Sequence, residues 1–199
     1  MALKFAVNNS LSAITSLPSS ISSGALNLIS TQTASASASL EFSMDSTYDS
    51  YVFKFINIHP ATDNVAFSVN FSTDGGSTYA VTKTSTSFRA RHDEGDTSTD
   101  LIYLTGSDLA QSTSDQTIAP TLGADNDQNC SGYLQIFNPS STTFVKHYVG
   151  RISLAYYADF IYDLYTAGYA NTTSAINAIR FQMSSGNIDD GIIKMYGVS

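Results

Sequence analysis

The sequence predicts an all-β protein, an antiparallel β-sandwich of jelly-roll type with an N-terminal arm. Short runs in which apolar and polar residues alternate recur along the chain, as half-buried strands require. Clusters of Gly, Ser, Asn and Asp separate these runs and supply turns, whereas helical periodicity is nearly absent. Only 13% of the residues are charged, and Ser and Thr provide much of the polar surface, which suits short strands with one solvated face.

The expected strands follow one another closely after residue 25. Residues 36–44 alternate cleanly with polar neighbours, and residues 51–58 are apolar on both faces, which is typical of a central strand. Residues 65–71 alternate again and end at the turn 72–77, whose two glycines allow positive φ. The remaining strands are expected over 79–84, 87–92, 101–104, 132–137, 144–156 and 164–170.

The end of the chain, residues 179–198, is its most clearly patterned part. An alternating run over 179–183 is followed by the loop Ser-Ser-Gly-Asn at 184–187 and by a second run over 191–198. We interpret the two runs as a β-hairpin that completes a sheet. No internal repeat of fixed period is visible, which argues against a propeller or a β-helix.

Residues 1–24 differ from the rest, and we assign them to an N-terminal arm that precedes one β-sandwich domain over 25–199. The segment is Ser-rich, contains Pro18 and spaces isolated apolar residues about three apart. This spacing would suit a short amphipathic helix, but Pro18 and the serines favour a partly extended arm that becomes ordered on a partner. A flexible tail is the alternative. The arm residues expected to dock on a partner are Leu3, Phe5, Leu11, Ile14, Leu17 and Ile21.

Charge and composition exclude several classes of protein. The net charge is −8 and the nine basic residues are scattered, so we expect no nucleic acid partner. No apolar run approaches the ~20 residues of a membrane helix, and the first residues lack the apolar core of a secretion signal, so we expect no membrane partner. The single cysteine, Cys130, excludes an intrachain disulfide and a Cys-based zinc site.

Nucleophilic catalysis would need a base beside a Ser or Cys. No Gly-x-Ser-x-Gly elbow is present, and the serines are so abundant that a nearby His carries no information. We expect His59, before Pro60, to shape a turn, and His92 and His147 to lie at the surface. A glycosidase would need two carboxylates across a cleft, but the candidate pairs lie among turn residues, where Asp bonds its own backbone: Asp159 with Asp163, and Asp189 with Asp190. We therefore expect no enzyme.

Residues 125–129, Asp-Asn-Asp-Gln-Asn, place oxygen ligands at alternate positions, as the opening of a calcium loop does. The pattern departs from an EF-hand at Cys130, where Gly is required, and at Ile136, where a bidentate Glu is required. We interpret the segment as a polar turn, with a calcium loop of another kind as the alternative, and we expect no cofactor and no metal.

Two segments are candidates for a surface that recognises a partner. The first is a long polar stretch without basic residues, interpreted as a solvated loop region, with an acidic lip for a basic partner or a cation as the alternative. Its acidic residues are Asp93, Glu94, Asp96, Asp100, Asp108, Asp115, Asp125 and Asp127. The second is an aromatic run that could pack on a partner or stack on sugar rings, although core packing is the default for most of its members. It comprises Tyr156, Tyr157, Phe160, Tyr162, Tyr165 and Tyr169.

Six turn-and-strand phrases, which together span nearly the whole chain, carry a family resemblance. They are residues 16–34, 45–51, 57–63, 137–143, 168–176 and 183–197, and include Asn-Ile-His-Pro-Ala-Thr-Asp and Phe-Asn-Pro-Ser-Ser-Thr-Thr. In these phrases the chain resembles small structural proteins of tailed-bacteriophage virions, particularly phages of marine bacteria. The resemblance implies a virion surface component with a jelly-roll-like sandwich and no known catalysis.

The resemblance does not decide between a capsid decoration (cement) protein, which docks on the phage head and stabilises it, and a tail protein. The small single domain, the N-terminal arm, the absent chemistry and the hydroxyl-rich, acidic exterior favour the decoration protein. The arm and one sandwich edge would dock across seams between capsid subunits, because open sheet edges need to be covered. The alternative is a tail fibre or receptor-binding adhesin domain that recognises a host surface glycan; a capsule esterase or glycosidase ranks third. The expected partners are other virion proteins, namely the major capsid protein or, in the alternative, tail proteins. The family analogy further implies a homo-oligomer, a trimer, located in the virion and assembled in the host cytoplasm.

Overall fold

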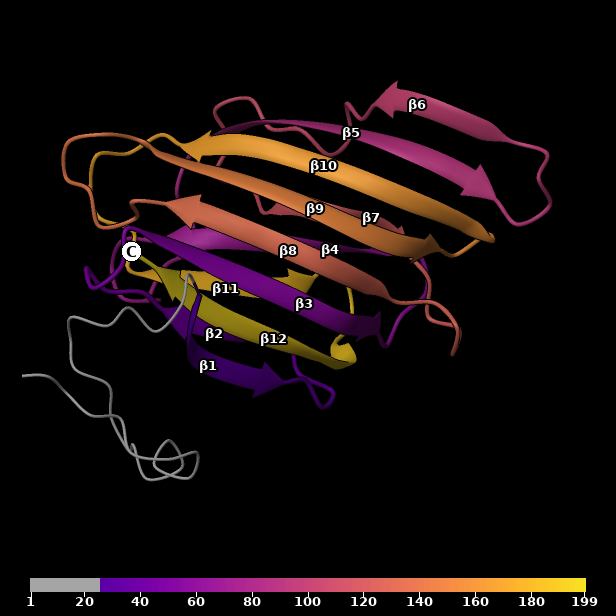
Figure 1. Ribbon diagram of the computed structural model, residues 1–199, viewed down its shortest axis with the longest axis horizontal. Coiled ribbons are helices and arrows are strands. Elements are labelled where there is room, and N and C mark those ends of the chain that lie inside the picture. The colour runs from indigo at the N-terminus through magenta and orange to yellow at the C-terminus, as the bar shows by residue number, and fades with distance from the viewer. Residues whose placement is uncertain (1–25) are drawn as a thin grey trace, which may run out of the picture.

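The computed structural model describes residues 26–199, which form twelve strands and no helix (Figure 1). The strands are β1 (Asn27–Thr33), β2 (Leu40–Ser43), β3 (Ser50–Pro60), β4 (Val65–Ser72), β5 (Lys83–Asp93), β6 (Thr99–Tyr103), β7 (Gln116–Leu122), β8 (Cys130–Phe137), β9 (Lys146–Tyr156), β10 (Phe160–Ala170), β11 (Ala178–Met183) and β12 (Ile188–Val198). Within these residues there is no helix that could cross a membrane. The expected arm, residues 1–24 with its six docking residues, lies outside the described part of the chain.

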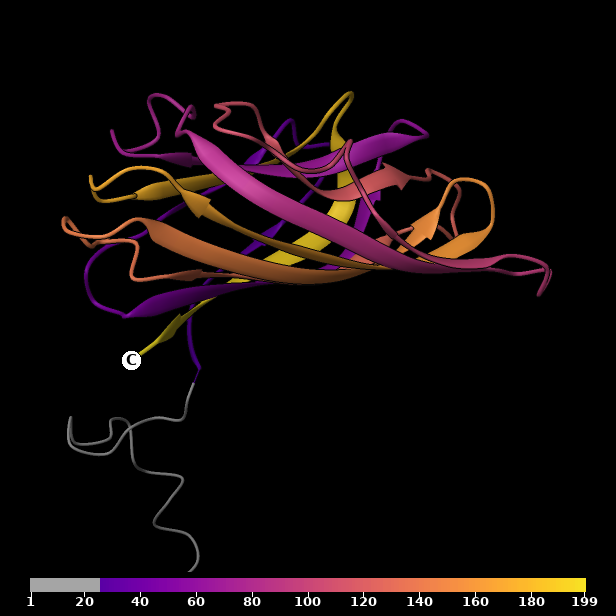
Figure 2. The same cartoon turned by 90° about the horizontal axis from the view of Figure 1, so that it is seen from above.

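All strand pairs are antiparallel, and they join into one sheet that folds back on itself (Figures 1 and 2). We call the run β1-β12-β3-β8-β9-β10-β5-β6 the long layer and the run β2-β11-β4-β7 the short layer. The layers are linked along one side by a single pair, Leu122 of β7 with Tyr156 of β9. The all-β, antiparallel prediction is therefore confirmed.

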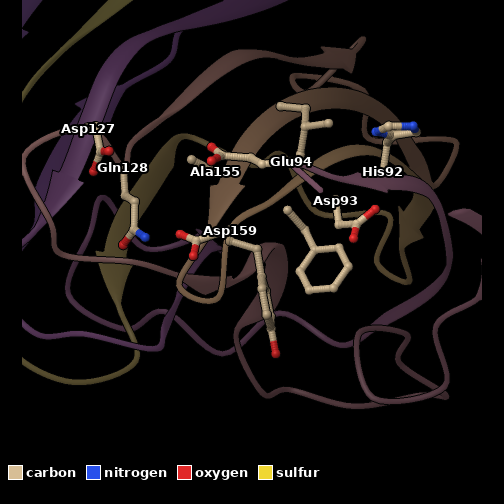
Figure 3. A pocket seen from close by; sticks show the side chains of 10 residues that line it. His92, Asp93, Glu94, Asp127, Gln128, Ala155 and Asp159 are labelled. Atoms are coloured by element: carbon tan, nitrogen blue, oxygen red, sulfur yellow. The ribbon is translucent and has the colours of Figure 1, made fainter. Parts of the chain in front are cut away.

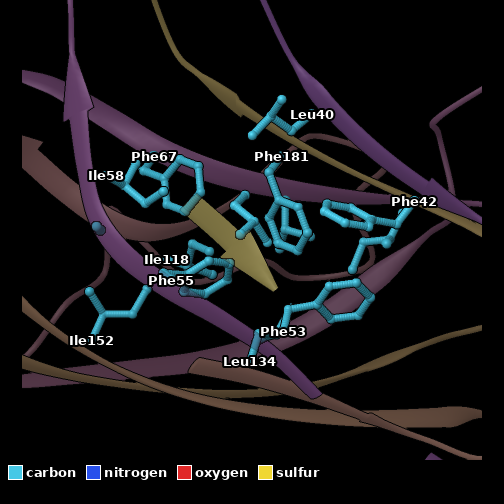
Figure 4. Packing of buried hydrophobic residues seen from close by; sticks show 14 of the residues in the cluster. Leu40, Phe42, Phe53, Phe55, Ile58, Phe67, Ile118, Leu134, Ile152 and Phe181 are labelled. Atoms are coloured by element: carbon cyan, nitrogen blue, oxygen red, sulfur yellow. The ribbon is translucent and has the colours of Figure 1, made fainter. Parts of the chain in front are cut away.

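The core fills the space between the two layers and is built around Phe181 of β11 (Figure 4). Its ring centroid lies 5.3 Å from that of Phe53 and 5.2 Å from that of Phe55, both on β3 of the opposite layer. Phe42 of β2 and Phe67 of β4 contact it from its own layer. Inward side chains therefore alternate with solvated ones along strands such as β2 and β12, which explains the period-2 pattern of the sequence there.

The expected hairpin over residues 179–198 is wrong. β11 pairs with β2 and β4 in the short layer, whereas β12 pairs with β1 and β3 in the long layer. The loop 184–187 therefore crosses from one layer to the other. The physical reason is that alternation requires only one buried face on each strand. A crossing meets this requirement as well as a hairpin does, because Phe181 of β11 and Ile193 of β12 enter the same core from opposite layers.

Other strand boundaries differ from those predicted from the sequence, because pairing with distant strands overrides the local pattern. The expected strand over 36–44 begins only at Leu40, because Ala36 has φ of 49° and the chain there crosses between the layers. The expected strands 79–84 and 87–92 are replaced by the single strand β5. The polar stretch between Asp93 and Asn129 contains β6 and β7. Pairing with β12 and β4 produces β1 and β7, neither of which alternates clearly in the sequence.

Candidate functional site

The acidic stretch does not form a single lip, because many of its carboxylates bind partners within the protein. Asp100 of β6 contacts Arg89 at 2.5 Å and Arg91 at 2.6 Å, both on the neighbouring strand β5. Asp93 accepts hydrogen bonds from Thr97 and Ser98 and so closes the β5–β6 turn; these bonds, led by the Thr97 hydroxyl, lower the pKa of its carboxyl.

The two candidate segments nevertheless meet at one end of the long layer, where they line a pocket of about 240 Å³ (Figure 3). The β5–β6 turn contributes Glu94 and the β9–β10 turn contributes Asp159, and the Glu94 amide donates to the Asp159 carbonyl at 3.1 Å. Figure 3 shows Asp127 on the opposite side of the pocket from His92. Within residues 26–199 the side chains of Glu94, Asp127 and Asp159 have no hydrogen-bond or ion-pair partner.

The aromatic run divides between the two faces of the long layer, as alternation along β9 and β10 requires. Tyr156, Phe160 and Tyr162 lie on the inner side, where the Tyr156 and Tyr162 rings stack at 4.9 Å. The guanidinium groups of Arg89 and Arg91 lie over Tyr162 and Phe160, 4.3 and 4.7 Å from the ring centroids. The sequence prediction of core packing therefore holds for this inner half, which forms the back of the pocket.

Of the other members of the run, Tyr165 belongs to an aromatic row that crosses the exposed face of the long layer. Strand register aligns side chains from β6, β5, β10, β9 and β8 in the order Tyr103, Phe88, Tyr165, Arg151 and Tyr133. The rings of Phe88 and Tyr165 are parallel at 4.9 Å, and Arg151 lies over Tyr165. This row is a flat surface suited to binding rather than to enclosing a substrate.

At the end of the row, β6 is an edge strand, which among residues 26–199 pairs only with β5. Its side chains include Leu101, 71% exposed, Tyr103, 51% exposed, and Ile102, which is also exposed. An edge strand with open backbone groups and large apolar side chains is a template for pairing with another chain. Reasoning from sequence treated this segment as an ordinary strand, because only the sheet order shows that it lies at an edge.

The residues considered for nucleophilic catalysis, the histidines and Cys130, do not lie together. His59 approaches Asp189 at 3.7 Å and His92 approaches Asp96 at 3.1 Å, and among residues 26–199 no histidine contacts a serine hydroxyl or the thiol of Cys130. Cys130 is fully buried, and burial raises the pKa of its thiol. No histidine is thus paired with a serine or cysteine nucleophile in the described residues.

Residues 125–129 form a polar turn in which the Gln128 amide donates to the Asp125 carbonyl at 2.8 Å. Their side chains point to two different places: Asp127 and Gln128 line the pocket of Figure 3, whereas Asn126 and Asn129 line a separate hollow beside His59. In the described part of the chain, no three His, Cys, Asp or Glu side chains are grouped to hold a metal ion.

Comparison of the chain with protein-family models, with curated proteins and with solved structures finds no match.

Proposed function

We propose that this protein is a structural component of a phage virion, a jelly-roll module that docks on the head surface as a capsid decoration protein and stabilises the head. The virion assignment rests on the sequence resemblance. The docking role is supported by one structural observation above all, the exposed apolar edge strand β6.

The strand order supports the jelly-roll assignment. Four strands of the long layer lie in the order β1-β12-β3-β8, and the short layer has the order β2-β11-β4-β7. Two facing four-stranded layers in these orders correspond to an eight-stranded jelly roll, an architecture common in viral capsid and lectin domains. The pair β5–β6 is inserted between β4 and β7, and the pair β9–β10 between β8 and β11.

Both insertions extend the long layer beyond β8, so β9, β10, β5 and β6 continue past the jelly roll. The extension ends in β6, whose outward backbone groups have no strand beside them within residues 26–199. Adding a strand or apolar surface from a neighbouring capsid subunit would satisfy these groups and bury Leu101 and Tyr103. A decoration protein needs such an adhesive edge.

Immunogold labelling of intact phage particles tests the location directly. Labels distributed over the heads are expected, whereas labels confined to the tails would refute head decoration. A second measurement follows DNA release on heating: heads lacking the protein should release DNA at a lower temperature, and adding the purified protein should restore the original temperature. Labelled heads with unchanged DNA release would refute the stabilising role.

The alternative, a receptor-binding domain that recognises a host glycan, is favoured by the pocket of Figure 3. Its three free carboxylates, Glu94, Asp127 and Asp159, can accept hydrogen bonds from sugar hydroxyls, and Phe160 offers an apolar wall. Under this hypothesis the protein binds host surface polysaccharide, and Asp159→Asn weakens that binding. Tail labelling together with such binding would replace the decoration proposal.

A further inference from the structure

Lys83 and Asn70 form a buried contact between the two layers that neither the core nor the proposed docking explains. Lys83 begins β5 in the long layer and Asn70 lies near the end of β4 in the short layer, and they are 0% and 2% exposed. The Lys83 Nζ donates to the Asn70 Oδ1 at 2.7 Å and to the Val81 carbonyl at 2.8 Å. Within residues 26–199 no carboxylate lies within ion-pair distance of this amine.

The amide of Asn70 is held by further groups on both of its polar atoms. Its Nδ2 donates to Asp115 Oδ1 at 2.8 Å, and its Oδ1 also accepts from the backbone N–H of Phe71 at 2.9 Å. Asp115 is fixed in turn by Gln182 Nε2 at 2.8 Å. The fold therefore brings the Lys83 amine beside the Asn70 side-chain amide. A carboxylate, that of Asp115, lies at the amide nitrogen, and a donor, the Phe71 N–H, lies at the amide oxygen.

We propose that Lys83 and Asn70 become joined by an isopeptide bond, formed by the folded protein itself. The neutral Lys83 amine attacks Cγ of Asn70, and the carbonyl π electrons move to Oδ1 to give a tetrahedral intermediate. Once both nitrogens are bonded to Cγ, the Asp115 carboxylate, which accepts a hydrogen bond from Nδ2, comes within reach of the attacking nitrogen, takes a proton from it and delivers that proton to the departing Nδ2. The Cγ–Nδ2 bond then breaks, the carbonyl re-forms, and one ammonia leaves. No oxidant, reductant or cofactor is required.

The separation of the reacting groups suits this reaction. Because a C=O bond is ~1.2 Å long, a nitrogen 2.7 Å from Oδ1 lies at most ~3.9 Å from Cγ, close to the separation of a near-attack arrangement. The Phe71 N–H is placed to stabilise the negative charge that develops on Oδ1.

The surroundings of Lys83 favour the nucleophilic form of the amine. Its Nζ lies 6.0 Å from the centroid of the Phe71 ring. Burial in these surroundings lowers the pKa of Lys83 to about 8, so an appreciable fraction of the amine is unprotonated near neutral pH.

Lys146 provides a matched comparison inside the same protein. It is also 0% exposed, and both lysines pair with Ala170, one from each neighbouring strand. Its Nζ, however, donates to the backbone carbonyls of Thr172 and Ser174 and has no side-chain amide beside it. Of these two buried lysines, only Lys83 therefore has the arrangement that permits an isopeptide bond.

The bond would cross-link the short layer to the extension that ends in β6. It would hold β4 and β5 together independently of hydrogen bonding, which suits a surface exposed to mechanical load. This inference concerns a covalent modification and does not depend on the virion proposal.

The mass of the intact, purified chain tests the inference first. The wild-type protein should be lighter than its sequence mass by one ammonia molecule. Cleavage before aspartate then locates the bond, because cuts before Asp63, Asp74 and Asp93 place Asn70 in peptide 63–73 and Lys83 in peptide 74–92. These two peptides should be recovered as one branched species. Full sequence mass with two separate peptides would overturn the proposal, as would ammonia loss located elsewhere.

Variants distinguish the roles of the three side chains. Lys83→Met and Asp115→Asn should each restore the full sequence mass, the first by removing the nucleophile and the second by removing the proton carrier. Lys146→Met should keep the mass deficit of the wild type. A deficit that survives Lys83→Met would refute the assignment, and one that survives Asp115→Asn would refute the role of the carboxylate. Because Asp115 is partly exposed, its variant is expected to fold even if replacement of Lys83 impairs folding.

Discussion

At the scale of single residues, Phe181 is the point through which the two layers are held together. Its ring contacts four other phenylalanines, with centroid separations between 5.2 and 6.2 Å. Offset and edge-on aromatic pairs each add about 0.5–1.5 kcal/mol beyond simple burial. Because these partners come from both layers, removing the ring weakens contacts on every side of the core.

We therefore expect Phe181→Ala to lower the free energy of unfolding by about 3–5 kcal/mol. That is a large fraction of the ~5–15 kcal/mol available to a typical domain. Urea denaturation measures the loss. Phe144→Ala serves as the control, since Phe144 is 69% exposed and its truncation should change stability by no more than about 0.5 kcal/mol. Equal effects of the two substitutions would contradict this account of the core.

A second residue-scale prediction concerns Gly191, which lies where β12 bulges against β3. Its φ of +123° is unfavourable for other residues, and a Cβ there would lie 2.7 Å from the Asn57 carbonyl oxygen and 2.8 Å from Ile58 Cα. Gly191→Ala should therefore lower stability by about 1–3 kcal/mol. Gly106→Ala is the control, because a Cβ at Gly106 meets nothing within 4 Å. Thermal unfolding of both variants distinguishes strain at the bulge from a general effect of replacing glycine.

At the scale of elements, local alternation predicts strands well but says little about their partners. The run that became β4 was predicted almost to the residue because one of its faces is wholly apolar. β1 was missed because its burial shows no clean alternation, and its strand conformation depends on pairing with β12. The loop 184–187 has the composition of a hairpin turn, yet local composition cannot distinguish a return within one sheet from a crossing to the other layer.

The pairing of β9 with β10 includes an ion pair that makes stability depend on pH. Arg151 donates two hydrogen bonds of 2.8 Å to the Asp163 carboxylate, and these bonds hold the pKa of Asp163 below its usual value. A carboxyl whose pKa is lower in the folded state stabilises the protein above its unfolded pKa and loses that contribution as pH falls through its folded pKa.

Accordingly, Asp163→Asn should be less stable than the wild type near neutral pH. The difference should shrink as the pH falls below about 4, where the wild-type carboxylate also becomes protonated. Added salt should reduce the difference as well, because both side chains are partly exposed. Urea midpoints across this pH range provide the measurement. A difference that persists undiminished in acid would show that the substitution acts through packing instead.

At the scale of the whole molecule, the candidate surfaces were only partly accessible to sequence reasoning. The acidic stretch and the aromatic run were both identified, and the fold brings Glu94 and Phe160 into the same pocket. The exposed apolar edge at β6 was not identified, because the exposure of Leu101 follows from β6 being last in the long layer. The contact between Lys83 and Asn70 was likewise invisible, since it joins two strands from different layers.

The edge position of β6 leads to the prediction that most directly tests the docking proposal. Leu101→Lys places a charge where a neighbouring capsid subunit would bury an apolar side chain, and an unpaired buried charge is costly. We expect binding to undecorated heads to weaken at least about tenfold, equivalent to ~1.4 kcal/mol. The folded protein itself should keep its stability, because Leu101 is 71% exposed. Phe144→Lys introduces the same charge at an equally exposed site in the β8–β9 loop and should leave binding unchanged. If the two variants bind alike, the contact with the head does not run through β6, and the docking edge must be sought elsewhere on the protein.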